Sequence, residues 1–217
     1  KEEKMVNIYE IFEKPMLEIL AGMEIKGIKV DNKFLKILSS NFEKKIKEIQ
    51  KKVFKLSKKE FNIASPKQLG EILYNDLKIA DLKRTKKGSF ATSASVLEDL
   101  AFKGHKFPQL VLDWRQVSKL KNTYSDSLPE HINPKTKRVH TSFLLAATTT
   151  GRLASSEPNL QNIPIKSEDG REIRKAFIDE KEHILISADY NQIEMRILAD
   201  LADVKELKKA FKNNEDI

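Results

Sequence analysis

Apolar side chains recur at intervals of three or four residues along much of the chain, the spacing that places them on one face of an α-helix. The pattern predicts four longer helices, at residues 6–23, 32–58, 66–75 and 107–128. A shorter helix is expected to begin at Ser93 or Ser95 and to bury Leu97 and Leu100. The second of the longer helices carries a lysine-rich outer face, which we expect to be solvated.

Polar residues and proline mark where these helices begin or bend. Pro15 is expected to break or kink the first helix, because proline lacks the N–H group that a helix interior needs. Asp31 follows a short extended segment at 28–30 and is a favourable N-cap. Ser65 is expected to cap the third helix in a capping box with Gln68. A helix start of this kind also suits a phosphate, so capping and phosphate binding both remain open.

The pattern changes beyond residue 138. Apolar and β-branched runs predict three strands, at 139–147, 174–178 and 183–188, and the third would be buried on both faces if residues 184–186 are all enclosed. Helical spacing then returns in two segments, at 191–201 and 204–213. The sequence therefore predicts an α+β fold that is mostly helical, with a helical region over 31–128 ahead of the mixed region.

Basic residues are concentrated in the first part of the chain. The net charge is +8 and the pI about 9.4. Residues 1–138 hold 29 basic and 18 acidic side chains, a balance of +11, whereas residues 139–217 hold 11 and 14, a balance of −3. Such a division suits a polyanion held beside carboxylates that bind metal ions. The basic segment 83–95 is either a solvated loop or a tip that touches a phosphate backbone.

Composition also excludes several classes of protein. Cysteine is absent, so a disulfide framework is impossible. No apolar run reaches the ~18 residues of a membrane span, and no signal peptide is visible. We expect a cytoplasmic protein that is not bound to a membrane. The chain begins at Lys1 and stops at Ile217 without a capping signal, so we also expect a piece of a longer protein.

A carboxylate stands at the end of the third predicted strand. Asp189 is placed where a sheet edge opens to solvent, and Mg²⁺ favours one or two carboxylates together with phosphate oxygens and water. Asp189 could equally cap the helix that follows. Glu194 could face the same pocket, but a two-metal site needs a second bridging acid that the sequence does not supply convincingly.

Residues 150–164 form a loop rich in amide and guanidinium groups. Gly151 allows close approach of the backbone, and Arg152 could reach a base edge or a phosphate. Asn159, Gln161 and Asn162 both donate and accept hydrogen bonds, so they could grip a duplex in the minor groove without reading its sequence. Asn and Pro are also plain turn formers, so a simple turn remains an alternative.

Two of these segments resemble motifs of the family A DNA polymerases. Thr150–Pro164 is similar to the family's Thr-Gly-Arg-Leu-Ser-Ser…Pro-Asn-Leu-Gln-Asn-Ile-Pro signature, and Ala188–Arg196 is similar to its motif A, Asp-Tyr-Ser-Gln-Ile-Glu-Leu-Arg. Further similarity lies in three short segments, at 121–124, 132–136 and 139–142. The chain departs from the usual pattern at Ala154, Asn191 and Met195, which are small changes.

The resemblance implies roles for particular residues. Asp189 would be one of two aspartates that hold the catalytic magnesium ions, and Tyr190 would offer its backbone carbonyl to a metal. Tyr190, Gln192, Ile193 and Glu194 would line the incoming nucleotide, with Glu194 crowding the 2′ position of its sugar. The chemistry implied is template-directed addition of deoxynucleotides to a primer 3′ end by two-metal phosphoryl transfer.

The resemblance also implies contacts with DNA. Arg152 would touch the minor groove at the primer end, and Asn159, Gln161 and Asn162 would hold template and primer. Contacts with the DNA backbone would come from four further residues, Asn62, Ser65, Lys119 and Thr123. The implied partners are primer–template DNA and deoxynucleoside triphosphates, bound by a monomeric parent protein.

Family resemblance further implies a division into domains. Residues 1–30 would form the connector from an exonuclease-like domain and the start of the palm. Residues 31–128 would form the helical thumb with 83–92 at its tip, and 129–217 the N-terminal part of an antiparallel-sheet palm, including motif A. The fingers and the second aspartate would lie outside this chain, so the fragment alone is expected to be inactive. Two rivals remain: a non-catalytic DNA-binding module, and a structural or interaction protein whose charge serves only solubility.

Overall fold

The computed structural model describes residues 5–79, 88–165 and 167–215. The chain divides into two compact units, Lys1–Glu180 and Lys181–Ile217. The mixture of helices with small antiparallel sheets confirms the predicted α+β, mostly helical class. Residues 80–87, which include part of the predicted basic loop, lie outside the described residues.

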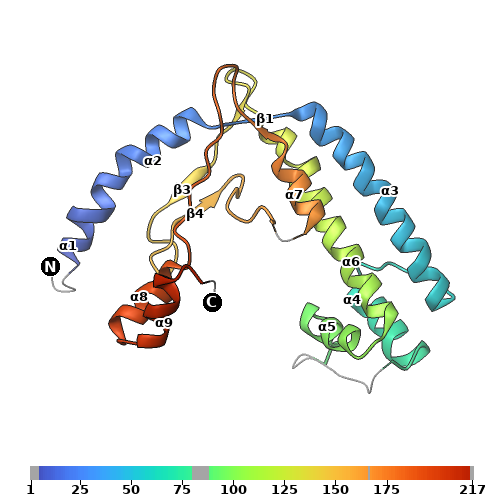
Figure 1. Cartoon of the computed structure of the whole chain (residues 1–217). Helices are drawn as coiled ribbons and strands as arrows, with labels where there is room; N and C mark the ends of the chain where they lie inside the picture. Colours follow the sequence, from blue (N-terminus) through green and yellow to red (C-terminus); the bar gives the residue numbers. More distant parts are fainter. Residues whose placement is uncertain (1–4, 80–87, 166, 216–217) are drawn as a thin grey trace. The chain divides into compact units, whose positions relative to one another are not determined.

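Helices make up most of the first unit (Figure 1). Its N-terminal helix runs through α1 (Val6–Ile8), the π-helical segment η1 (Tyr9–Glu13) and α2 (Lys14–Lys26). The later helical elements are α3 (Asn32–Ser57), α4 (Pro66–Gly70), the π-helical η2 (Glu71–Asp76), α5 (Ala94–Phe102), α6 (Lys106–Leu120), the π-helical η3 (Lys121–Asp126), the 3₁₀ turn η4 (Leu128–His131) and α7 (Glu168–Arg174).

Two small antiparallel sheets complete this unit. In the first, β1 (Ile28–Val30) lies between β2 (Arg138–Val139) and β5 (Phe177–Ile178). Lys29 is paired with Arg138 on one side and with Ile178 on the other. The second sheet pairs β3 (Ser142–Leu144) with β4 (Ala154–Ser156). The first sheet therefore joins three segments that are far apart in the sequence.

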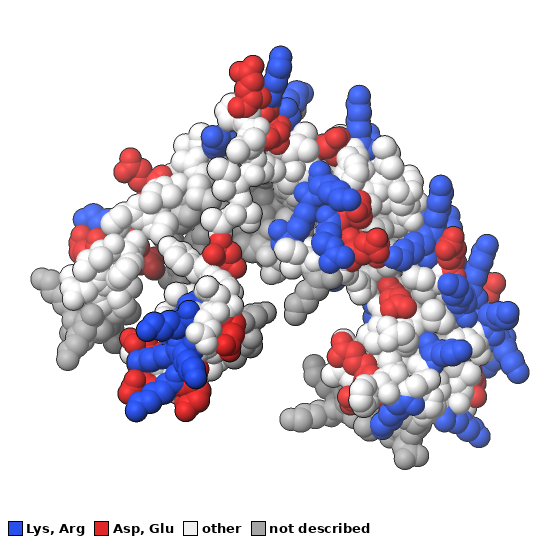
Figure 2. Space-filling view, in the orientation of Figure 1, with Lys and Arg blue, Asp and Glu red and all other residues white. Residues whose placement is uncertain are grey.

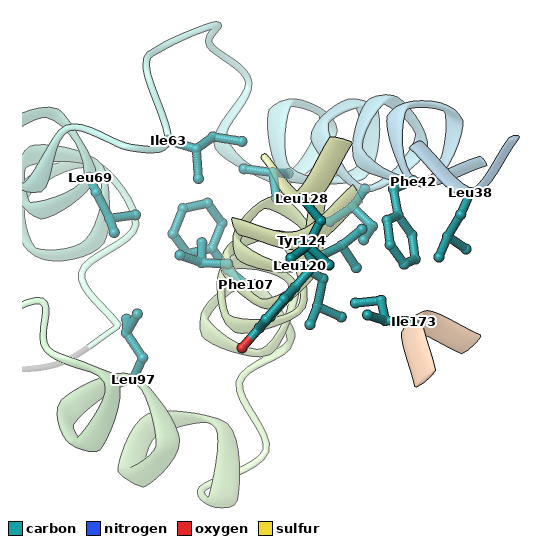
Figure 3. Close-up of a cluster of buried hydrophobic side chains, with 14 of the residues drawn as sticks. Leu38, Phe42, Ile63, Leu69, Leu97, Phe107, Leu120, Tyr124, Leu128 and Ile173 are labelled. Atoms are coloured by element: carbon teal, nitrogen blue, oxygen red, sulfur yellow. The ribbon is translucent and has the colours of Figure 1, made fainter. Parts of the chain in front are cut away.

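The core lies where α3 and α6 pack side by side in opposite directions (Figures 1 and 3). Leu35 and Val53 of α3 and Val111 of α6 have no exposed surface. Figure 3 shows the same cluster extending to Leu97 of α5 and Ile173 of α7. Burial of large aliphatic side chains contributes roughly 1.5–3 kcal/mol each, so this cluster is the main support of the helical region.

Lysines line the opposite, outward face of α3. The exposed lysines of this helix are Lys33, Lys36, Lys44, Lys45, Lys47, Lys51, Lys52 and Lys55. Figure 2 shows Lys and Arg gathered over this part of the surface. The solvated lysine face that the sequence predicts is therefore confirmed.

Several predicted boundaries are also confirmed. Asp31 caps α3 by accepting a 3.0 Å hydrogen bond from the Phe34 N–H. Ser65 caps α4 by accepting from the Gln68 N–H at 3.4 Å. The reciprocal half of the predicted capping box is wrong, because the Gln68 side chain accepts from the Asn62 N–H at 2.7 Å. The Gln68 side-chain oxygen is therefore bonded to the turn before α4 and does not cap the helix.

Pro15 does not break the first helix, so that part of the expectation is wrong, and the kink stays a prediction. It lies in the first turn of α2, directly after the π-helical η1. A π turn shifts the hydrogen-bond ladder by one residue, and the Lys14 N–H accordingly bonds the Tyr9 carbonyl. The shifted ladder accommodates Pro15, which has no N–H to donate inside this continuous helix.

The predicted strands are shorter than expected or absent. The first is split into β2 and β3, and Ala146 beyond them has a φ of 54°, which a strand does not allow. Residues 174–176 are not a strand, because Ser167 caps α7 by accepting from the Gly170 N–H at 3.1 Å and the helix runs to Arg174. Only Phe177 and Ile178 pair, as β5.

The third predicted strand, at 183–188, is not formed. Ile184 and Ile186 are 78% and 82% exposed rather than buried on both faces. A central strand is buried only when neighbouring strands and covering helices enclose it, and none of the described residues pairs with this segment. The second unit therefore consists of an extended segment followed by α8 (Ile193–Leu201) and α9 (Lys205–Lys212). Within the described ranges, no helix is long and apolar enough to span a bilayer.

Candidate nucleic-acid interface

The amide-rich loop begins at the β3–β4 hairpin. Gly151 has a φ of 73°, and open space surrounds the position where a Cβ would stand. Arg152 is exposed two residues before β4, and its backbone carbonyl accepts a 2.8 Å hydrogen bond from the Thr148 hydroxyl. The backbone of Arg152 is thus held while its side chain reaches the surface.

Asn159 and Gln161 fold the loop upon itself. Asn159 Oδ1 accepts from the Gln161 N–H at 3.0 Å and from the Ser155 hydroxyl at 3.3 Å. Gln161 Nε2 donates to the Leu153 carbonyl at 2.9 Å. Among the described residues, Asn159 Nδ2 has no partner, so this exposed amide presents its donor outward. Gln161 uses its side-chain nitrogen within the loop, while its side-chain oxygen can still accept a hydrogen bond.

Side chains from distant elements hold the second half of the loop. The Tyr124 hydroxyl donates to the Asn162 carbonyl. Arg174 donates through Nη2 to the Ile163 carbonyl at 3.0 Å and through Nε to the Pro164 carbonyl at 3.3 Å. The exposed Asn162 amide makes no hydrogen bond with any described residue and is available to a ligand.

Sequence reasoning missed Tyr124 and Arg174. Tyr124 lies in the predicted helix 107–128 and is only 3% exposed, and a buried Tyr hydroxyl usually needs a hydrogen-bond partner. Burial raises the pKa of Tyr124, which keeps its hydroxyl protonated and able to donate. Arg174 lies in the predicted strand 174–178, whereas the N-cap at Ser167 places it on helix α7.

The four residues that are predicted to contact the DNA backbone form two pairs. Asn62 and Ser65 meet in the turn before α4, where the Ser65 N–H donates to the Asn62 carbonyl at 2.9 Å. Asn62 Oδ1 also accepts from the Ala64 N–H at 2.9 Å. Lys119 and Thr123 are both exposed, four residues apart on the continuous α6–η3 helix, and neither side chain has a partner among the described residues. All four stay predictions as DNA contacts.

A charged network fixes η3 against α3. Lys121 Nζ lies 2.7 Å from Asp126 Oδ2 and 3.6 Å from Glu43 Oε2. The hydrogen bond with Asp126 raises the pKa of Lys121. Burial alone would raise the pKa of Asp126, but hydrogen bonds from Lys121 and Ser39 outweigh it and lower that pKa. The network supports the segment that carries Thr123 and Tyr124.

The motif A residues lie in the second unit. Asp189 and Tyr190 are exposed in the extended segment before α8. Gln192 has a φ of 51° and is the N-cap of α8, while Ile193 and Glu194 are exposed in its first turn. The alternative that Asp189 caps this helix is therefore wrong, because the capping position belongs to Gln192.

Arg196 holds the turn between Asp189 and α8. Its Nε donates to the Asn191 carbonyl at 2.8 Å. Its guanidinium carbon lies 4.6 Å from the centre of the Phe211 ring of α9, within the range of a cation–π contact. The second unit thus has its own link between the motif A turn and its helices.

The described residues contain no group of three or more His, Asp or Glu that could hold a metal ion. Asp189 Oδ atoms and the Tyr190 carbonyl are hard oxygen donors of the kind that Mg²⁺ prefers. These two residues fit part of a magnesium site, in which phosphate oxygens, water and a further acid would supply the remaining ligands.

Comparisons with known proteins agree with these features. A family model described as DNA polymerase family A matches residues 32–217. DNA polymerase I of Rhizobium leguminosarum is 51% identical over 213 residues, covering 98% of this chain and 21% of that protein. DNA polymerase I of Caldicellulosiruptor bescii is 47% identical over 210 residues, covering 97% of this chain and 24% of that protein.

A solved structure is similar over nearly the whole chain. The POL domain of Pol1 from M. smegmatis, in complex with DNA primer-template and dNTP, matches with a TM-score of 0.86 and 39% sequence identity. The match covers 98% of this chain and 37% of that one. This chain spans less than a quarter of the length of the two relatives above. Together, the family match and these identities show that the chain belongs to DNA polymerase family A.

Proposed function

We propose that this chain is part of a template-directed DNA polymerase of the DNA polymerase I type, which serves DNA replication and repair. The observation that carries the proposal is the likeness of 98% of the chain to a polymerase domain bound to DNA primer-template and dNTP. In this proposal residues 1–30 are the connector and the start of the palm, 31–128 are the thumb, and 129–217 are the first part of the palm.

The proposed reaction extends a primer by one deoxynucleotide. The primer 3′ hydroxyl loses its proton to water and its oxygen attacks the α-phosphorus of a deoxynucleoside triphosphate, so that one P–O bond forms and pyrophosphate leaves as the other P–O bond breaks. Asp189 and the Tyr190 carbonyl would hold Mg²⁺, which would supply stabilisation of the negative charge that develops during phosphoryl transfer. Gln192, Ile193 and Glu194 would line the nucleotide, with the Glu194 side chain against the 2′ position of the sugar.

The loop would grip the product duplex beside the primer end. Arg152 and the outward amides of Asn159 and Asn162 present hydrogen-bond donors. Every base pair offers acceptors in the minor groove, so donors held there bind any sequence. Gln161 would contribute its free acceptor and shape the loop, while Asn62, Ser65, Lys119 and Thr123 would contact phosphates of the DNA backbone.

A salt titration of DNA binding tests this assignment. The affinity for labelled primer–template DNA is measured against salt concentration for the wild type, for Arg152→Ala and for a control, Lys44→Ala, which removes an equal charge from the solvated face of α3. Each phosphate contact adds about 0.9 to the log–log salt slope. We expect binding that prefers the primer–template junction and weakens by roughly tenfold with Arg152→Ala alone, as for one good contact with a base edge.

The affinity could instead show no preference for the primer–template junction and fall equally in Arg152→Ala and Lys44→Ala. That result would mean that only overall charge attracts DNA. Nucleotide incorporation by the isolated 217-residue chain would contradict a different part of the proposal, because the second aspartate and the triphosphate-binding residues are assigned outside it. An unchanged activity of the complete polymerase with Asp189→Ala would favour a DNA-binding module instead.

A further inference from the structure

Side chains from other elements bind several backbone carbonyls between Ser156 and Pro164. The Thr141 hydroxyl donates toward the Ser156 carbonyl at 3.1 Å and the Pro158 carbonyl at 2.8 Å. Tyr124 and Arg174 bind three further carbonyls, those of residues 162–164. Because irregular backbone has no ladder of its own, these donors determine its shape.

Tyr124 anchors the loop from the hydrophobic core. Its ring lies within the buried cluster, with the hydroxyl oxygen at the cluster's edge (Figure 3). Core packing fixes the ring, so the hydroxyl is held at one position and bonds the Asn162 carbonyl there. Phenylalanine at this position would keep the packing and remove only the hydrogen bond.

Arg174 anchors the same stretch from the end of α7. Two nitrogens of one planar guanidinium bind two consecutive carbonyls, those of Ile163 and Pro164. This rigid fork fixes the direction of the chain between the carbonyls, which a lysine cannot do with its single ammonium group. Gly170 of α7 adds a close contact, since a Cβ there would lie 2.7 Å from Pro164 Cβ.

These anchors bind the backbone of the loop and do not use the side-chain amides of Asn159 and Asn162. Asn162 offers its carbonyl to Tyr124, while its side-chain amide has no partner among the described residues. Asn159 Oδ1 is engaged within the loop, and its Nδ2 points to no described acceptor. The donors proposed to meet the minor groove are therefore preorganised by residues that need not touch DNA.

We propose that Tyr124 and Arg174 are positioning residues, which hold the loop so that its amides grip the duplex at the primer end. This inference rests on the proposed function. Preorganisation raises affinity by removing the entropy cost of ordering a loop during binding. Loss of either anchor should therefore weaken DNA binding and primer extension without changing the number of phosphates contacted.

The test uses the complete polymerase that carries these residues, with Tyr124→Phe, Arg174→Gln and Arg174→Lys. We expect Tyr124→Phe to weaken primer–template binding about fivefold, the equivalent of one hydrogen bond of about 1 kcal/mol. Arg174→Gln should weaken it about tenfold, and Arg174→Lys should restore little of that loss although it restores the charge. The salt slope should stay unchanged in all three variants. A slope reduced by about 0.9 in Arg174→Gln would mean that Arg174 contacts a phosphate directly and would overturn the proposal.

A second measurement tests whether Arg174 acts on DNA affinity through the loop amides. If Arg174 acts through the amides, Arg174→Gln should cost little once Asn159→Ala and Asn162→Ala are present, because interacting residues are non-additive. Full additivity would overturn the positioning role. In extension assays we expect the KM for primer–template to rise while kcat at saturating DNA changes less than twofold.

Two matched variants control for loss of stability. Tyr74→Phe removes another buried Tyr hydroxyl, which donates to the Ala91 carbonyl at 2.7 Å, and shows the cost of such a loss to thermal stability. Arg138→Gln removes an arginine that donates to the Gly27 carbonyl at 3.1 Å and should leave DNA affinity unchanged.

Failure of this inference differs from failure of the proposed function. If Arg152→Ala weakens binding but Tyr124→Phe and Arg174→Gln do not, the loop grips DNA without needing its anchors, and the positioning role is wrong. If Arg152→Ala has no effect either, the loop is not a DNA contact at all, and the proposed function of this segment is wrong as well.

Discussion

The Ser39 hydroxyl of α3 donates a 2.6 Å hydrogen bond to Asp126 Oδ1 of η3, 87 residues later in the chain. Lys121 bonds the other carboxylate oxygen of Asp126 at 2.7 Å. Both oxygens of this carboxylate are thus used where the π-helical segment meets α3. The charge of Asp126 therefore contributes to the packing of the helical region, and its protonation should weaken that packing.

Acid should reduce stability through Asp126. Its pKa is lowered in the folded state, so its contribution is present above the unfolded pKa of about 3.9 and is lost as pH falls through the lower, folded pKa. We expect Asp126→Asn to reduce the free energy of unfolding by about 1 kcal/mol or less at pH 7, since the pair is partly exposed. Urea denaturation from pH 7 down to pH 2.5 should show this difference shrinking below about pH 4. A difference that is constant with pH would contradict the role of the charge.

Gly170→Ala should disturb the anchored loop. The added Cβ would lie 2.7 Å from Pro164 Cβ and 2.9 Å from the Pro164 carbonyl oxygen, and overpacking of this kind costs about 1–3 kcal/mol. Gly22→Ala is the control, because nothing lies within 4 Å of a Cβ at that helical position. It should stabilise the protein by up to about 1 kcal/mol. Thermal or urea unfolding measures both, and equal effects would contradict the close contact.

Ser65 allows capping to be separated from phosphate binding. Ser65→Ala should cost about 1 kcal/mol of stability, because α4 loses the side chain that accepts from the Gln68 N–H. Ser65→Asp keeps an equally good cap but adds a negative charge. If a DNA phosphate lies there, Ser65→Asp should retain stability and still weaken DNA binding, most strongly at low salt. Unchanged binding at low salt would leave Ser65 with capping alone.

Asp189→Asn should separate catalysis from binding in the complete polymerase. The side chain is exposed, so the substitution should change stability by less than about 0.5 kcal/mol. Loss of a metal-binding carboxylate should lower primer extension by about a thousandfold or more, corresponding to about 4 kcal/mol of transition-state stabilisation. Primer–template affinity without nucleotide should change little. Retained activity, measured beside Asp203→Asn as an exposed control, would contradict the catalytic role of Asp189.

Helices and their caps could be predicted from local sequence, because their hydrogen bonds are local. The apolar stripe of α3, its cap at Asp31 and the start of α5 after Ser93 all follow from residues a few positions apart. The strands could not be predicted as well, since pairing depends on distant partners. The run around Ile184 to Ile186 has the composition of a buried strand, yet none of the described residues pairs with it.

Some residues of the candidate site could likewise be predicted from the sequence, and others could not. The motifs around Arg152 and Asp189 could be identified because their residue order is distinctive. The anchors could not, because Tyr124 and Arg174 meet the loop only in three dimensions, 38 and 10–11 residues away in sequence. A side chain that binds backbone carbonyls leaves no motif, since any residues could supply those carbonyls.

The π-helical segment Lys121–Asp126 has a geometric consequence for α6. It holds one more residue than the same length of α-helix would, so its last residues are turned by about 100° from their places in an uninterrupted continuation of α6. This segment presents Tyr124 to the core and Lys121 to Glu43, while Thr123 stays exposed. The segment is in effect a one-residue insertion that the fold has absorbed. Deleting a single residue there would restore ordinary helix geometry and misdirect the hydroxyl of Tyr124.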